Sequence, residues 1–194
     1  MLDSQTFLET MRLPSKPKKR LDGEQLWELA LRSLDRRAYA AAEIRKKLAL
    51  RAETPAVLDQ TMKKLQDYGL LDDARFAESY AAARLDGQGF GARRVLADLR
   101  ARSVSSSVAE NAVRQTYAKT DETELIEKYL QRKFRGKNLR EYLSEDKHLA
   151  SAFRRLRMAG FGAGSSIRVL KRYTGRAEEL ETMDEPEGED ETIR

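Results

Sequence analysis

Apolar residues recur along this chain with the period of an amphipathic helix. Within the first 70 residues, three successive sets of apolar side chains are spaced three or four residues apart, which places each set on one helix face. The sets are Trp27, Ala30, Leu31 and Leu34, then Ala41, Ile44 and Leu48, then Leu58, Met62 and Leu65. No stretch alternates apolar and polar residues as a strand would. The pattern therefore predicts three consecutive helices.

The same apolar skeleton occurs three times. A displacement of 51 residues carries Ala30, Leu34, Ile44, Leu48, Val57 and Met62 onto Ala81, Leu85, Val95, Leu99, Val108 and Val113. A further displacement of 57 residues carries Val95, Leu99, Val104 and Val113 onto Ala152, Leu156, Phe161 and Leu170. Units that repeat at about this period are single supersecondary modules that stack on one another. We predict an all-α fold, an elongated tandem array of three three-helix modules, and a binding function in preference to an enzyme built around a pocket.

The module boundaries follow from the repeat and from the composition of the two ends. The three modules are predicted at residues 23–70, 71–119 and 120–175. Residues 1–22, which contain lysines and prolines, are predicted to be a flexible basic arm. Residues 176–194 are predicted to be an acidic disordered tail, because acids, Pro and Gly dominate them.

Charge is unevenly distributed along the chain. Residues 177–194 contain nine acids and one base, which leaves 36 bases and 23 acids, a net charge of +13, on the rest of a chain whose total is +5. The tail either shields a basic surface from other polyanions or only keeps the protein soluble, and the sequence leaves both interpretations open. With no cysteine and no apolar run long enough to span a membrane, the chain is expected to be cytoplasmic. It is also expected to be a monomer.

Basic side chains gather on particular predicted helices and indicate a polyanionic or filament partner. The alternative is an ordinary solvated helix surface, and Arg94 could be neutralised by Asp98 at i, i+4. The candidate partner-binding residues are Arg36, Arg37, Arg84, Arg93, Arg94, Arg100, Arg154, Arg155, Arg157, Arg168, Lys171 and Arg172.

Catalytic and cofactor chemistry finds little support in the sequence. His148 is the only histidine, and no nucleophile-elbow motif accompanies it, so we interpret it as structural. Gly87, Gly89 and Gly91 lack the lysine and hydroxyl of a P-loop and indicate a turn that needs positive φ angles. We predict no catalytic residue, no metal site and no cofactor.

One segment resembles a known family. The run Gly69-Leu70-Leu71-Asp72-Asp73-Ala74-Arg75-Phe76-Ala77, followed by Tyr80, Arg84, Gly87, Gly89, Val95 and Leu99, closely resembles the central signature of RecX regulatory proteins. The run Arg36-Arg37-Ala38-Tyr39 with Glu43-Ile44 and Lys47-Leu48 is similar to the first-repeat motif, and Leu156 with Gly160-Phe161 to the third. Three positions depart from the pattern: Ala40 replaces a capping serine, and Ala52 and Ser103 replace helix-ending glycines.

The resemblance implies a non-enzymatic regulator of the RecA recombinase. Proteins of this family are tandem three-helix modules that bind in the groove of the RecA–DNA filament and damp the ATPase, strand-exchange and coprotease activities of RecA. Weak nonspecific binding to single- or double-stranded DNA is also expected, and the alternative function is a helix-turn-helix-like protein acting directly on duplex DNA. Signature residues expected to be structural are Gly69, Leu70, Asp72, Asp73, Phe76, Ala77, Gly87 and Gly89.

Overall fold

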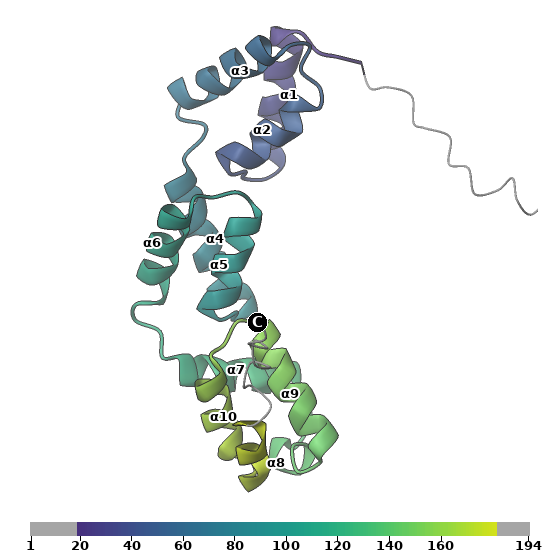
Figure 1. Cartoon of the computed structure of the whole chain (residues 1–194), viewed down its shortest axis with the longest axis vertical. Coiled ribbons are helices and arrows are strands. Elements are labelled where there is room, and N and C mark those ends of the chain that lie inside the picture. The colour runs from purple at the N-terminus through teal and green to yellow at the C-terminus, as the bar shows by residue number, and fades with distance from the viewer. Residues whose placement is uncertain (1–18, 182–194) are drawn as a thin grey trace, which may run out of the picture.

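The computed structural model of the protein describes residues 19–181 (Figure 1). Within that range the chain is helical, and its one β-type pairing is an isolated bridge between Leu21 and Ala52. The all-α prediction is confirmed. The first two groups of helices are α1 (Gly23–Arg36), α2 (Ala41–Ala49) and α3 (Pro55–Asp67), then α4 (Asp73–Gln88), α5 (Ala92–Ala101) and α6 (Ser106–Tyr117). The third group is α7 (Glu122–Lys133), α8 (Leu139–Tyr142), α9 (Asp146–Met158), α10 (Ala163–Lys171) and the 3₁₀ helix η1 (Gly175–Glu181).

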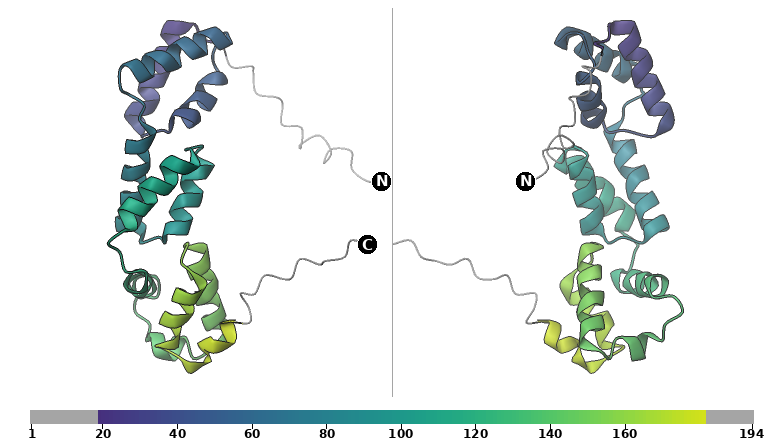
Figure 2. Two further views of the ribbon diagram at one scale, coloured as in Figure 1. Left: turned by 60° about the vertical axis from the view of Figure 1, so that its left-hand side comes forward. Right: turned by 90° about the vertical axis from the view of Figure 1, so that its right-hand side faces the viewer.

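The three groups follow one another along the long axis of the molecule (Figures 1 and 2). This arrangement confirms the predicted elongated tandem array. None of the helices in residues 19–181 is both long and apolar enough to cross a membrane. The third group departs from the three-helix pattern, because it includes the one-turn helix α8 and the 3₁₀ helix η1.

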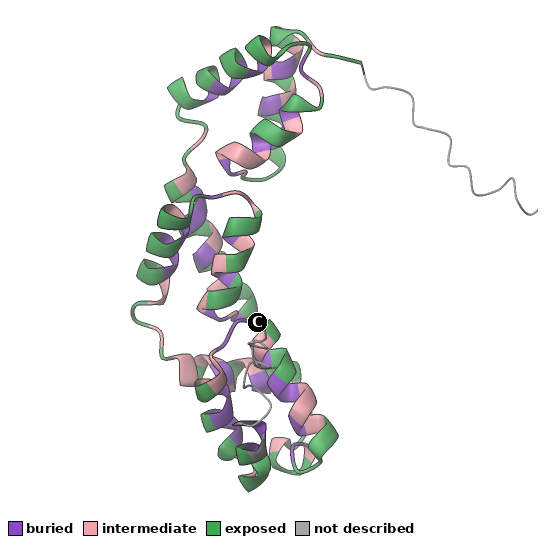
Figure 3. Ribbon diagram, in the orientation of Figure 1, coloured by how far each residue is buried: buried purple, intermediate pink, exposed green. Residues whose placement is uncertain are grey.

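Each group of helices encloses its own hydrophobic cluster, and buried positions lie where its helices face one another (Figure 3). The helices of the first group bury apolar side chains such as Leu26, Ile44 and Leu65, whereas Leu31, which the predicted apolar set of the first helix included, is 39% exposed. Burying a side chain of this size stabilises a fold by about 1.5–3 kcal/mol. Since each cluster is small, the stability of the array also depends on how neighbouring groups meet.

Short polar side chains cap the starts of several helices, and glycine ends others. The Thr54 hydroxyl accepts a hydrogen bond from the Val57 amide at 3.2 Å, and the Asp72 carboxylate accepts one from the Arg75 amide at 3.0 Å. Ser105 also occupies an N-cap position, but its side chain makes no capping hydrogen bond. Gly69 has a φ of 65°, the left-handed conformation that ends a helix at little cost.

The residues after the two helix-ending glycines behave differently. Gly160, with a φ of 91°, is followed by Phe161, which folds back and is fully buried. Leu70 follows Gly69 and its amide donates to the Leu65 carbonyl at 2.9 Å, but its side chain remains 43% exposed. An apolar residue after a left-handed glycine is predicted to pack back onto the preceding helix. This prediction is wrong for Leu70, because only its main chain turns back.

Both predicted end segments are shorter than expected where the structure describes them. Leu21 belongs to the fold, since its amide donates to the Arg51 carbonyl at 2.7 Å and its carbonyl accepts from the Glu53 amide at 2.9 Å. At the other end, Ala177 and Leu180 of η1 are buried in the third cluster. Partial burial of Leu21 against the first cluster and burial of Ala177 and Leu180 attach these residues to the helix groups. The rest of the predicted arm and tail, residues 1–18 and 182–194, lies outside the described residues.

The first junction, between α2 and the helices of the second group, is mainly polar. Ala40 at the start of α2 has no capping side chain of its own and is buried in the second cluster. The carboxylate of Asp73 accepts a hydrogen bond from the Ala41 amide at 2.7 Å and so caps α2 from the next group. Lys46 Nζ also donates to the Ser103 hydroxyl across the junction at 2.7 Å.

The second junction includes a close contact between the backbones of two helix groups. The Gly91 amide donates to the Ala159 carbonyl at 2.8 Å. A Cβ atom at Gly91 would lie 2.5 Å from the carbonyl carbon of Gly160, and a Cβ atom at Gly160 would lie 2.5 Å from Arg94 Cβ. Only glycine at both positions allows α5 to approach the end of α9 this closely.

Candidate functional site

The candidate arginines fall into two classes, those bound within the chain and those open to a partner. The side chains of five of them are exposed and make no hydrogen bond or ion pair with any other residue of the range 19–181. These five are Arg36, Arg93, Arg154, Arg155 and Arg168. They are distributed over α1, α5, α9 and α10, so all three helix groups present at least one unpaired cation.

The other candidate residues already have partners. Arg94 Nε lies 3.0 Å from Asp98 Oδ1, as the i, i+4 spacing predicted. Arg84 lies over the Tyr80 ring, and Arg157 Nη1 donates to the Phe161 carbonyl at 3.1 Å. The ion pairs of the remaining residues are Arg37–Glu43, Arg100–Glu110, Lys171–Glu178 and Arg172–Glu127. The twelve candidates thus do not form one uniform phosphate-binding face.

Glu43 is the centre of a charge cluster at the first junction. Its carboxylate binds Arg37 of the same group at 2.9 Å and Arg102 of the next group at 3.2 Å. Partial burial opposes ionisation, but the hydrogen bonds and positive charges of the two arginines outweigh it and lower the pKa of Glu43. Sequence reasoning missed this role, because Arg102 and Glu43 are 59 residues apart in the chain.

Tyr39 completes this cluster. The Arg37 guanidinium lies 3.7 Å from the centre of the Tyr39 ring, and Lys47 Nζ donates to the Tyr39 hydroxyl at 2.9 Å. The hydrogen bond from Lys47 and the positive charges lower the pKa of Tyr39. Arg37, Tyr39 and Lys47 belong to the first helix group, and in this cluster the Glu43–Arg102 ion pair is the contact that crosses the junction. The Arg37 guanidinium is therefore engaged within its own group.

Most of the signature residues have a structural role in this fold. Asp72 and Asp73 cap α4 and α2 respectively, and Phe76 and Ala77 are buried in the second cluster. Of the three glycines expected in a positive-φ turn, only Gly89 has a left-handed conformation, with a φ of 58°. Gly87 is helical, and the prediction of a positive φ there and at Gly91 is wrong. Gly91 instead serves the close backbone contact at the second junction.

His148 packs against neighbouring residues of the third helix group. His148 is stacked on Tyr142 with ring centres 4.0 Å apart, and its Nδ1 lies 3.1 Å from the Tyr142 carbonyl oxygen. No group of three or more His, Cys, Asp or Glu in residues 19–181 is arranged to hold a metal ion. The stacking on Tyr142 and the contact with its carbonyl oxygen give His148 a packing role.

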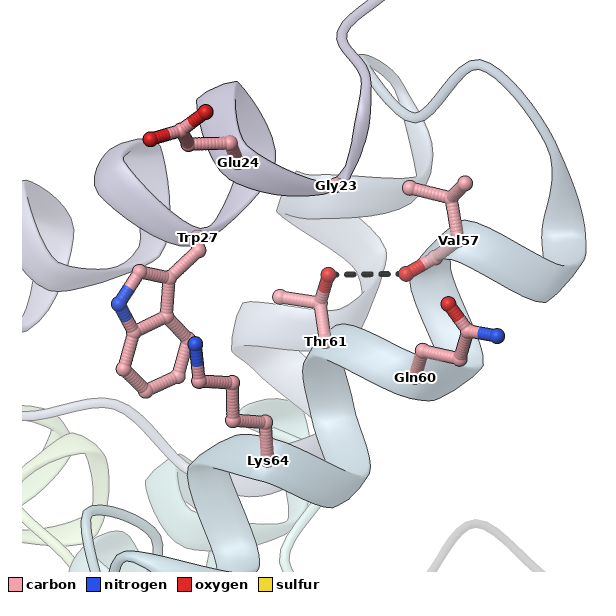
Figure 4. Close-up of a pocket in the computed structure, with 7 residues that line it drawn as sticks. All are labelled: Gly23, Glu24, Trp27, Val57, Gln60, Thr61 and Lys64. Atoms are coloured by element: carbon pink, nitrogen blue, oxygen red, sulfur yellow. Dashed lines mark hydrogen bonds between the residues drawn. The ribbon is translucent and has the colours of Figure 1, made fainter.

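An open cavity of about 440 Å³ lies between α1 and α3 (Figure 4). Lys64 Nζ lies 4.3 Å from the centre of the Trp27 ring, and the Thr61 hydroxyl donates to the Val57 carbonyl at 2.8 Å. Glu24 is the only acid that lines it, and a single open carboxylate beside a lysine-covered ring gives no basis for a catalytic centre.

Two of the exposed, unpaired arginines lie near the end of α9. Arg154 and Arg155 lie in its last turns, and the neighbouring Met158 is 71% exposed. Arg94 of α5 donates from Nη1 to the Met158 carbonyl at 3.3 Å, so the two helices meet at this point. The result is a positively charged, partly apolar surface at the second junction.

Comparisons with known proteins give a consistent match. Residues 72–113 match the family model described as RecX, second three-helix domain. The chain is 31% identical to a Regulatory protein RecX of Vibrio vulnificus over 134 residues, which cover 69% of this chain and 83% of the relative. It is 40% identical over 84 residues to a Regulatory protein RecX of Chromohalobacter salexigens, of which the match spans 55%.

A solved structure shares the fold. The crystal structure of RecX from Lactobacillus salivarius aligns with a TM-score of 0.57 over 78% of this chain and 96% of that one, at 19% sequence identity. At that identity the likeness concerns the arrangement of helices alone.

Proposed function

This chain belongs to the RecX family of regulatory proteins, and we propose that it binds the RecA–DNA filament and inhibits the recombinase, ATPase and coprotease activities of RecA. By this proposal it modulates recombination and the SOS response. We further propose that it acts in the cytoplasm, because a regulator of an intracellular filament has to reach that filament, and that it acts as a monomer.

The distribution of unpaired arginines is the observation that carries the proposal. Arg36, Arg93, Arg155 and Arg168 stand on successive helix groups of an elongated molecule. A helical filament offers the same surface again at each subunit, so several weak contacts spaced along the array add up to tight binding. Long-range attraction between the basic body and a polyanionic filament raises the association rate as well.

The test is the DNA-dependent ATPase activity of RecA, measured with increasing amounts of this protein. We expect inhibition well below one molecule per RecA with free DNA in excess, because a protein that limits filament growth acts on many subunits at once. Inhibition that appears only when the protein saturates the DNA, and that added DNA relieves, would show competition for DNA and overturn the proposal.

A second experiment separates filament binding from direct reading of duplex DNA. A filament regulator needs no contacts with base edges, so its affinity for naked duplex should be weak, salt-dependent and nearly independent of sequence. A helix-turn-helix regulator would prefer its site roughly 10³-fold or more over random duplex. Selection from a random duplex library, run beside a pull-down on RecA filaments, decides between them. An enriched motif without retention on filaments contradicts the proposal.

A further inference from the structure

We propose that the end of α9, with Met158 at its centre, is a protein-docking surface that fits an acidic protein face containing an apolar recess. The inference deepens the proposed function and rests on it, because the partner face is taken to belong to the protein part of the filament and not to its DNA. We call Arg154, Arg155 and Met158 the α9-end surface.

The exposure of Met158 is the first observation. Its side chain is 71% exposed at the last residue of α9, whereas its neighbours Leu156 and Ala159 are almost fully buried. The orientation of α9 on its core therefore directs Met158 outward. A flexible, polarisable methionine is well suited to fill an irregular recess on a partner.

The second observation is the charge around Met158. Arg155 and Arg154 precede it by three and four residues, so both side chains are its neighbours on the helix surface. Both arginines are exposed and have no ion-pair partner among residues 19–181. The acid of this helix, Asp146, lies at its opposite end and pairs with Arg176. The helix dipole favours cations at this end, but it gives no reason for an exposed methionine.

The third observation is that the surface is held in place. Arg94 donates to the Met158 carbonyl at 3.3 Å, and the Gly91 amide donates to the next carbonyl, that of Ala159, at 2.8 Å. Gly160 and Phe161 then reverse the chain, with the Phe161 amide bonded to the Leu156 carbonyl at 3.1 Å. A surface fixed by its own fold loses little conformational entropy when a partner binds.

These features favour a protein over a nucleic acid as the occupant. Methionine and arginine are enriched in protein interfaces relative to the rest of a protein surface, and a few residues packed in a desolvated centre supply much of the binding energy. Phosphate recognition needs the arginines and makes no use of Met158. The two unpaired guanidinium groups attract acidic residues of the partner, and the methionine fits an apolar recess that those acidic residues surround.

The experiment compares Met158→Ala with a matched control, Leu50→Ala. Leu50 is 75% exposed at the end of α2 and belongs to a different helix group. Each variant is titrated against RecA ATPase on single-stranded DNA and, separately, against a labelled naked duplex. Circular dichroism and thermal unfolding of each variant check that the fold is intact.

We expect Met158→Ala to raise the half-inhibitory concentration about tenfold while its affinity for duplex stays within about twofold of the original. Leu50→Ala should change neither quantity. The double variant Arg154→Glu/Arg155→Glu should lose inhibition by a larger factor, because it reverses the charge that faces an acidic rim.

Two results would overturn the inference, and a third would overturn the proposed function. If Met158→Ala inhibits as well as the original protein, or if its inhibition and its duplex affinity fall in parallel, the α9-end surface is not a protein-docking site. If the original protein itself fails to inhibit RecA, the proposed function is wrong and the inference that rests on it falls as well.

Discussion

Replacing Gly91 by alanine should open the second junction without unfolding the helix groups on either side. The φ of Gly91 is −73°, which alanine adopts readily, so the effect of the change comes from contact alone. The added Cβ would lie 2.5 Å from the carbonyl carbon of Gly160 and 2.8 Å from the amide nitrogen of Phe161. Both neighbours are backbone atoms, which cannot rotate away as the end of a side chain can.

The size of the effect follows from two contributions. Overpacking against a rigid neighbour costs about 1–3 kcal/mol. The hydrogen bond from the Gly91 amide to the Ala159 carbonyl, 2.8 Å long, contributes about 1 kcal/mol and is lost if the helices separate. Because the clash is between backbone atoms of two different helix groups, separating the groups relieves it more easily than unfolding either of them.

Small-angle X-ray scattering and thermal unfolding together provide the assay. Gly91→Ala should increase the radius of gyration and lower the unfolding temperature of the third helix group. The matched control is Gly87→Ala, at a helical glycine whose added Cβ meets no atom within 4 Å. This control should stabilise α4 by about 0.5–1 kcal/mol and leave the scattering curve unchanged. A Gly91→Ala variant with unaltered scattering and stability would refute the reasoning.

Four further perturbations test individual contacts. Ser103 is held at a φ of 64°, so Ser103→Gly should stabilise the protein by about 1 kcal/mol in urea unfolding. Asp73→Ala removes the acceptor for the Ala41 amide and should cost about 1 kcal/mol, seen as faster hydrogen exchange at the start of α2, whereas Asp73→Asn should retain most of the protection. Because the pKa of Glu43 is lowered in the folded protein, ionised Glu43 stabilises the fold above its unfolded pKa, near 4.5, and this stabilisation is lost as pH falls through its folded pKa. The free energy of unfolding of Glu43→Gln, measured against pH in the acid range, should lack this loss. Burial and the charge of Asp86 raise the pKa of Tyr117 to about 12, so its contribution is full below the unfolded value, near 10, and decreases as pH rises through 12. Absorbance titration should show a tyrosine that ionises near pH 12 and that is absent in Tyr117→Phe.

The helices and several of their ends could be predicted from the sequence because the forces that form them act locally. A period of three or four residues identified α1, α2 and α3, and the capping ability of Thr54 and Asp72 is a property of short side chains next to free amides. The left-handed helix end at Gly69 is equally local. The side chain of Leu70 escaped prediction, because only the surrounding packing decides whether an apolar residue after such a turn is covered.

The sequence by itself therefore determined the all-helical class, the tandem repeat, the family and the excess of positive charge. The tertiary structure decided which charges are open to a partner. Arg37 and Arg102 meet at Glu43, and Arg172 meets Glu127, only because the fold brings together residues far apart in the chain. The tertiary structure also places Asp73 where it caps α2, a helix of the preceding group. The physical reason is range: helix propensity, and capping by a helix's own N-cap residue, depend on neighbours within about four residues. Ion pairs, burial, the capping of α2 by Asp73 and backbone contacts between modules depend on distances that exist only after the chain has folded.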